Sequence, residues 1–172
     1  NLYGTTGKGD SLASWTNTGT TLSTDGEWIY NNTTSTGEGY LDKAITASKY
    51  YFLAINTKAV ATIASCRLNI TQYDSSSTVL ADDTTTFDYL NMLSTEKRLG
   101  SKFQVNASAV LLRIYYIVNN SQTLYTKEYT LIEITTDEYN NLSVDELMAK
   151  YPYVESDGET IEPTALGCGI SN

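Results

Sequence analysis

Residues 66–73 read CRLNITQY, and this stretch decides the fold because its side chains alternate in character. Leu68 and Ile70 occupy every second position, and polar residues stand between them. Those polar residues are Arg67, Asn69, Thr71 and Tyr73. Successive side chains of a β-strand point to opposite faces of a sheet. The spacing therefore predicts a strand with one face in a core and a second face suited to polar recognition.

A second stretch, residues 110–118, repeats this alternation further along the chain. Leu112 and Ile114 share one face with Tyr116 and Val118. The opposite face carries Arg113 and Tyr115, together with Leu111 and Ile117. The polar faces of the two stretches are candidates for parts of one sheet surface.

Short alternating runs of this kind recur through the first 135 residues. We expect strands at 14–16, 27–30, 39–45, 50–58, 66–73, 99–105, 110–118 and 125–135. Clusters of Asn, Asp, Gly and Ser separate these runs, and both prolines, Pro152 and Pro163, follow them. Regularly spaced short strands with such turns predict an all-β jelly-roll β-sandwich of two antiparallel sheets.

The end of the chain changes character. Ser143 and Glu146 have the spacing of a capping box, which predicts a short C-terminal helix over Val144–Lys150. A polar, Gly-rich stretch follows and indicates a linker or tail. We therefore divide the chain into a β-sandwich binding domain at 1–135, a helical exit segment at 136–154 and a linker or tail at 155–172.

Charge and composition narrow the range of partners. The 172 residues include 20 Asp or Glu, 11 Lys or Arg and 14 Tyr, and the formal net charge is −9. Phosphate backbones and anionic lipids are bound mainly by clustered cations, so neither a nucleic acid nor a membrane is an expected partner. No apolar run approaches the length of about 18 residues that a membrane helix needs. A neutral ligand such as a glycan is compatible with this charge.

Most catalytic devices are missing from the sequence. There is no His, which excludes Ser-His-Asp and Cys-His triads and His-based metal sites. Cys66 and Cys168 form no metal motif; one disulfide between them is allowed, and we interpret them as free thiols. A pair of carboxylates is the one remaining device, and a long loop carries four candidates. These are Asp82, Asp83, Asp88 and Glu96, which we interpret as solvated loop charges, so no enzyme activity is predicted.

Residues suited to sugar binding are plentiful by contrast. Aromatic rings stack on the apolar faces of sugars, and planar Arg and Asn groups hydrogen-bond the hydroxyls. The candidate carbohydrate-binding residues on the two alternating strands are Arg67, Asn69, Tyr73, Arg113 and Tyr115. Trp28, Tyr30 and Tyr40 are further candidate platforms. For Trp28 a second interpretation, a plug at one end of the core, stays open.

The order of segments resembles a known group of proteins over residues 1–135. Residues 15–17 (WTN), 39–41 (GYL), 50–58 (YYFLAINTK), 111–115 (LLRIY) and 129–134 (YTLIEI) carry the likeness, with Leu2 near the start. The chain resembles the carbohydrate-binding jelly-roll modules of glycoside hydrolases and of phage tail proteins. Residues 137–154 resemble the exit segment of such domains in tail and baseplate proteins of phages and prophages of Gram-positive bacteria.

This resemblance implies a function and a setting. It implies a non-catalytic module that contacts host cell-wall polysaccharide, located in the virion or at the cell surface. Further domains of a larger protein are the other implied partners, and whether that protein is a trimer, as many tail proteins are, is left open. The alternatives are a structural spacer without a ligand, an accessory module of a glycoside hydrolase, and a small glycosidase.

The resemblance also bears on metal binding. Many similar modules carry two Asp before the last strand that help to hold a structural calcium ion. The matching stretch here is residues 125–129 (YTKEY), in which Lys127 argues against calcium and Glu128 offers a single oxygen ligand. The metal site is left open, and no other cofactor is expected.

Overall fold

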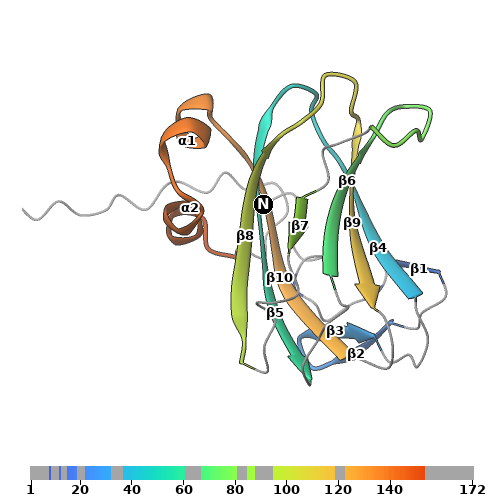
Figure 1. Ribbon diagram of the computed structural model, residues 1–172. Coiled ribbons are helices and arrows are strands. Elements are labelled where there is room, and N and C mark those ends of the chain that lie inside the picture. The colour runs from blue at the N-terminus through green and yellow to red at the C-terminus, as the bar shows by residue number, and fades with distance from the viewer. Residues whose placement is uncertain are drawn as a thin grey trace, which may run out of the picture.

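Two five-stranded antiparallel sheets pack face to face in the part of the chain that the structure describes (Figure 1). The structure is a computed structural model and describes residues 8, 12, 15–18, 22–31, 37–60, 67–80, 85–87, 95–118 and 123–153. Sheet A contains, in spatial order, β1 (Trp15–Thr18), β4 (Gly37–Ala44), β9 (Leu111–Val118), β6 (Arg67–Tyr73) and β7 (Thr85–Phe87). Sheet B contains β2 (Leu22–Asp25), β3 (Trp28–Asn31), β10 (Thr123–Ile134), β5 (Tyr50–Val60) and β8 (Lys97–Gln104).

The chain crosses repeatedly between these sheets. It passes from β3 to β4, from β4 to β5 and from β5 to β6, and three later connections make the same change of sheet. This connectivity is typical of a jelly roll. The jelly-roll β-sandwich predicted from the sequence is confirmed.

The core lies between the sheets and is built by the alternation of side chains along each strand. Leu53 and Ile55 of β5 contact the same buried cluster as Ile70 of β6 and Ile114 of β9. Phe52 points the other way, and it is fully buried in a second cluster on the outer face of sheet B. Because β5 is covered on both faces, its sequence reads as a continuous apolar run instead of an alternating one.

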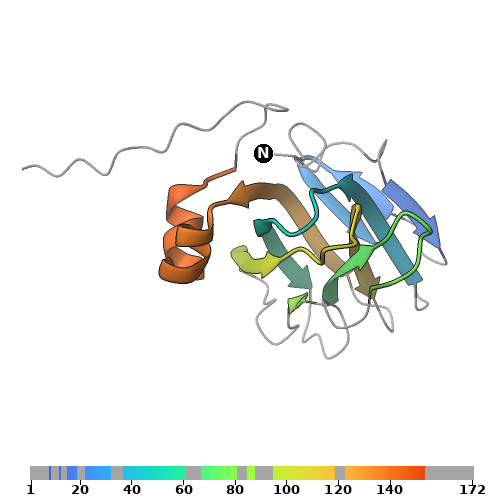
Figure 2. The same cartoon turned by 90° about the horizontal axis from the view of Figure 1, so that it is seen from above.

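Two short helices cover part of the outer face of sheet B. α1 (Thr136–Asn141) and α2 (Val144–Lys150) lie beside β5 and β8, on the side away from sheet A (Figure 2). Gly100 of β8 admits this packing, because a Cβ there would come within 2.9 Å of Val144. In the described part of the chain, no helix is long and apolar enough to span a bilayer.

A network centred on Glu138 joins the two helices. Its carboxylate accepts a hydrogen bond of 2.7 Å from Lys150 Nζ and a short one from the Tyr151 hydroxyl. The same group closes the capping box of α1 by accepting from the backbone N–H of Thr135. Burial by itself would raise the pKa of Glu138, but the hydrogen bonds from Lys150, Tyr151 and Thr135 outweigh it and lower that pKa to about 2.

The sequence did not reveal every element. The predicted helix over Val144–Lys150 is present with its Ser143 cap, but α1 was missed although Thr135 and Glu138 have the same spacing. The described strands β2 and β7 were also missed. Both have four residues or fewer, which is too short for a periodic pattern to emerge.

Candidate functional site

Strands β4, β9 and β6 are neighbours in sheet A, and their register assembles one polar and aromatic surface. Tyr115 of β9 has Tyr40 of β4 as its partner on one side and Asn69 of β6 on the other. The preceding residue of β9, Ile114, is fully buried in the core. Tyr115 therefore lies on the opposite, outer face. We call this surface the sheet A face. Its members are Tyr40, Asp42, Asn69, Thr71, Tyr73, Arg113 and Tyr115.

Arg113 lies at the centre of the sheet A face. Its guanidinium donates to both carboxylate oxygens of Asp42, from Nε at 2.6 Å and from Nη2 at 2.7 Å. Its carbon Cζ lies 3.8 Å from the centroid of the Tyr40 ring, so the planar group is stacked on that ring. The hydrogen bond to Asp42 raises the pKa of Arg113, which therefore stays charged. The fork and the stack together fix the orientation of the guanidinium.

Two phenol groups continue this surface beside Arg113. The hydroxyls of Tyr73 and Tyr115 form a short hydrogen bond, and Arg113 Nη1 lies 3.4 Å from the Tyr115 oxygen. Tyr73 is buried, and that burial, with the bond to Tyr115, raises its pKa to about 12. Tyr115 is half-buried, and its hydroxyl is hydrogen-bonded to that of the buried Tyr73. Arg67 starts β6, but its side chain lies outside the described part of the chain.

A turn closes one end of the sheet A face. Asp74 follows Tyr73 and accepts hydrogen bonds of 2.8 Å from the backbone N–H groups of Ser76 and Thr78. The turn brings Val79 back to pair with Tyr73, and the Val79 side chain remains 53% exposed. An exposed apolar residue, Val79, therefore lies beside the buried Tyr73 at this end of the face.

Trp28 and Tyr30 lie on the other sheet. They flank the buried Ile29 in β3, on the outer face of sheet B, where Tyr30 stacks on Tyr125 with ring centroids 5.2 Å apart. Lys58 Nζ lies 4.2 Å from the centroid of the Trp28 ring. Of the seven predicted sugar-binding residues whose side chains the structure describes, five thus lie on the sheet A face and two, Trp28 and Tyr30, on the outer face of sheet B. Trp28 is half-buried outside the core, which excludes the plug interpretation.

Lys127 occupies the stretch in which the resemblance implies calcium ligands. Its ammonium lies 3.9 Å from Glu27, 3.5 Å from Glu96 and 3.9 Å from Glu128, and 4.5 Å from the centroid of the Trp28 ring. The positive charge among these three carboxylates is therefore supplied by Lys127. Among the described residues, no group of three or more His, Cys, Asp or Glu is placed to hold a metal ion.

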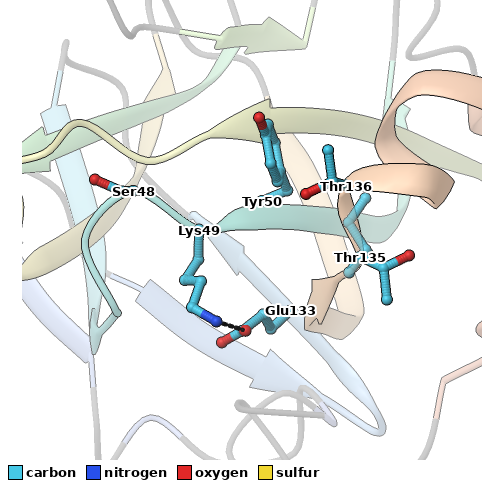
Figure 3. Close-up of a pocket in the computed structure, with 7 residues that line it drawn as sticks. Ser48, Lys49, Tyr50, Glu133, Thr135 and Thr136 are labelled. Atoms are coloured by element: carbon cyan, nitrogen blue, oxygen red, sulfur yellow. Dashed lines mark ion pairs between the residues drawn. The ribbon is translucent and has the colours of Figure 1, made fainter.

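A pocket of about 410 Å³ opens at one end of sheet B (Figure 3). Lys49 and Glu133, which form an ion pair of 3.0 Å, line it together with Thr135 and Thr136. The Tyr50 ring is stacked on Tyr139 with centroids 4.4 Å apart. None of the predicted sugar-binding residues lines this pocket.

The sequence analysis missed Asp42, although its spacing of two residues from the candidate Tyr40 in a predicted strand implies that the two share a face. Of the loop carboxylates, Glu96 is exposed and accepts a hydrogen bond of 3.0 Å from Asn56. The other three, Asp82, Asp83 and Asp88, lie outside the described residues, as do Cys66 and Cys168.

Comparison with known proteins finds similarity at the level of structure. No protein-family model matches the chain, and no curated protein matches it in sequence. The enzymatically active domain of bacteriophage CBA120 tailspike protein 4 matches with a TM-score of 0.64 and 14% identity, over 77% of this chain and 21% of that one. A family 16 carbohydrate-binding module matches with a TM-score of 0.60 and 13% identity, over 77% of this chain and 100% of that one.

A third match comes from a bacterial enzyme. The CBM22-1 xylan-binding domain of Paenibacillus barcinonensis Xyn10C has a TM-score of 0.53 and 10% identity, over 77% of this chain and 93% of that one. The chain thus spans about a fifth of the tailspike chain but nearly the full length of the two modules. At this level of identity the matches concern the fold. The protein has the jelly-roll architecture that carbohydrate-binding modules and this tailspike domain share.

Proposed function

We propose that the chain is a non-catalytic carbohydrate-binding module and that the sheet A face is its binding surface. The observation that carries the proposal is the grouping of Tyr40 and Tyr115 around a guanidinium that Asp42 holds in one plane. Aromatic rings offer stacking surfaces for the C–H faces of sugars, and Arg and Asn supply donors for hydroxyl groups. Both described helices lie on sheet B, so neither covers this surface.

The composition of the face supports binding without catalysis. Glycoside hydrolysis needs two carboxyl groups on either side of the scissile bond. Among the members of the sheet A face named above, Asp42 alone has a carboxylate, and Arg113 engages both of its oxygens. Such a carboxylate is neither free to protonate a leaving group nor paired with a second one.

The biological setting is a second part of the proposal. The module belongs to a phage or prophage tail protein, contacts host cell-wall polysaccharide, and acts beside other domains of a larger protein. The resemblance of residues 137–154 to tail-protein exit segments and the fold match to a tailspike domain support this setting. An accessory module of a glycoside hydrolase, acting outside the cell, is the alternative that the fold match to a xylan-binding domain supports.

Calorimetric titration of the purified chain against neutral and acidic cell-wall polysaccharides and plant glucans and xylans tests the binding role. We expect heat from at least one polymer, and a loss of binding by about 1–3 kcal/mol in Arg113→Ala. Lys58→Ala is the matched control, since it removes a cation stacked on an aromatic ring of the opposite sheet. Equal losses in both variants contradict the sheet A face as the surface. No heat from any polymer favours a structural spacer.

A further inference from the structure

We infer that Asp42 sets the charge preference of the sheet A face, and that the face selects uncharged saccharide over carboxylated or phosphorylated saccharide. This inference rests on the proposed function and adds a specificity-determining residue to it. Its basis is the way in which the donors of Arg113 are distributed.

Three of the five N–H groups of Arg113 already have acceptors. Nε and Nη2 donate to Asp42, and Nη1 has the Tyr115 oxygen 3.4 Å away. The edge formed by Nε and Nη2 is one of the two edges of a guanidinium that can match a carboxylate or phosphate bidentately. Asp42 occupies that edge, so an anionic ligand has to displace an intramolecular carboxylate to reach it.

The remaining two N–H groups, one on Nη1 and one on Nη2, have no partner among the described residues. They belong to the two terminal nitrogens of the guanidinium. Sugar hydroxyls can accept from them and bring no charge beside Asp42. The Tyr40 ring beneath the guanidinium extends the surface on which such a sugar ring stacks.

The electrostatics of the face point the same way. Arg113 and Asp42 cancel each other in charge, and the side chains of the other members, Tyr40, Asn69, Thr71, Tyr73 and Tyr115, are uncharged. An anionic sugar next to the pair meets the Asp42 carboxylate at close range as well as the cation. The chain as a whole carries a formal charge of −9, which adds to the repulsion of anions.

The pair is also accessible enough for a ligand to sense it. The side chain of Arg113 is 21% exposed and that of Asp42 is 34% exposed. Removal of the Asp42 charge alone leaves an uncompensated guanidinium with an open fork. Asp42→Asn therefore converts a surface for hydroxyl groups into one for anions.

The test compares one glycan in two charge states. Barley β-glucan, laminarin and galactomannan are titrated before and after oxidation of the C6 hydroxymethyl group to a carboxylate, which leaves the backbone unchanged. For the wild-type chain we expect the neutral form to bind at least about tenfold more tightly, as expected for like charges placed side by side. The affinity of the wild-type chain for the neutral form is expected to change less than about twofold between about 50 and 500 mM salt.

Asp42→Asn should raise the affinity for the oxidised polymer by about tenfold or more and make it salt-sensitive. Glu133→Gln is the matched control: it changes the net charge by the same amount in the exposed ion pair with Lys49, and it should leave the preference unchanged. Melting curves of both variants establish that they are folded. The comparison of neutral and oxidised polymer with the wild-type chain does not depend on either variant.

The outcomes separate this inference from the proposed function. If the wild-type chain binds the oxidised polymer as tightly as the neutral one, and Arg113→Ala abolishes that binding, the face is a glycan site but Asp42 does not set its charge preference. An equal shift in Asp42→Asn and Glu133→Gln overturns the inference in the same way. Absence of binding to either form of every polymer overturns both.

Discussion

Tyr40 and Tyr115 are register partners on β4 and β9, and their ring centroids lie 5.9 Å apart with the planes tilted by 54°. The two residues are far apart in the chain, and only the pairing of these strands makes them neighbours. Arg113 lies against the Tyr40 ring and donates toward the Tyr115 hydroxyl, so the guanidinium connects the two residues. The energetics of this face can be tested one group at a time.

Truncation of either ring should weaken glycan binding. We expect Tyr40→Ala and Tyr115→Ala each to cost about 1–3 kcal/mol of binding free energy, the usual scale for an aromatic anchor. Tyr30→Ala removes a ring of the same type from the outer face of sheet B and should leave the affinity unchanged. Calorimetric titration with the best ligand of the polysaccharide panel measures all three. A loss in Tyr30→Ala as large as in Tyr40→Ala would assign binding to the other sheet.

Tyr73 should affect folding as well as binding, because its side chain is only 8% exposed. Tyr73→Ala removes a buried ring and should lower the free energy of unfolding by about 3–5 kcal/mol. Tyr73→Phe removes only the hydroxyl that bonds Tyr115 and should cost about 0.5–1.5 kcal/mol. Urea denaturation followed by tryptophan fluorescence measures both values. If Tyr73→Ala were as stable as the parent, the ring would not be packed as described.

Ile70 provides the matching test of the core. It is fully buried between the sheets, one position from Asn69 on the sheet A face. Ile70→Ala should cost about 2–5 kcal/mol of stability through lost contacts and a residual cavity. Well below its melting temperature the folded variant should bind glycan with nearly the parental affinity. Asn69→Ala should show the reverse, with weaker binding and a small change in the urea midpoint.

A fall in pH should destabilise the pair of helices α1 and α2 through protonation of Glu138. Its folded-state pKa of about 2 lies below the ordinary value of 4.5 for a Glu side chain, so its carboxylate contributes stability that is present above about pH 4.5. That contribution is lost as the pH falls through the folded value. The loss follows a slope of at most about 1.4 kcal/mol per pH unit for one group.

Glu138→Gln should lower stability at pH 7 and flatten the decline between pH 4.5 and about 2 relative to the parent. Thermal melts at half-unit pH intervals, with Glu133→Gln as a control from an exposed ion pair, measure this difference. If the Glu138→Gln and parental profiles stay parallel through this window, the depressed pKa does not contribute to stability.

Chelation should have little effect on stability, because the Lys127 ammonium already lies within 4 Å of Glu27, Glu96 and Glu128. We expect the melting temperature in excess EDTA to stay within about 2 °C of the value in calcium. Differential scanning calorimetry with and without about 1 mM calcium measures it. A fall of about 10 °C or more that calcium reverses would correspond to several kcal/mol and would reveal a metal site elsewhere in the chain.

Local patterns in the sequence were sufficient for the two faces of β6 and β9. Alternation alone separated Ile70 from Asn69 and Thr71, and Ile114 from Arg113 and Tyr115, because a strand turns successive side chains to opposite sides whatever its neighbours are. The cap at Ser143 was predictable for a similar reason, since a capping box forms within four residues. Thr135 carried an equally local signal for α1, which the sequence analysis overlooked.

Strand neighbours, in contrast, were decided only by the tertiary structure. Alternation gives each strand two faces but does not say to which sheet the strand belongs, because pairing between distant segments depends on the packing of the whole core. The register of β4 with β9 put Asp42 beside Arg113, while β3 carried Trp28 and Tyr30 to the opposite side of the sandwich. The sequence by itself determined which residues of β6 and β9 face away from the core. Only the fold determined that a carboxylate and a guanidinium from distant strands meet on one face, since no local interaction brings them together.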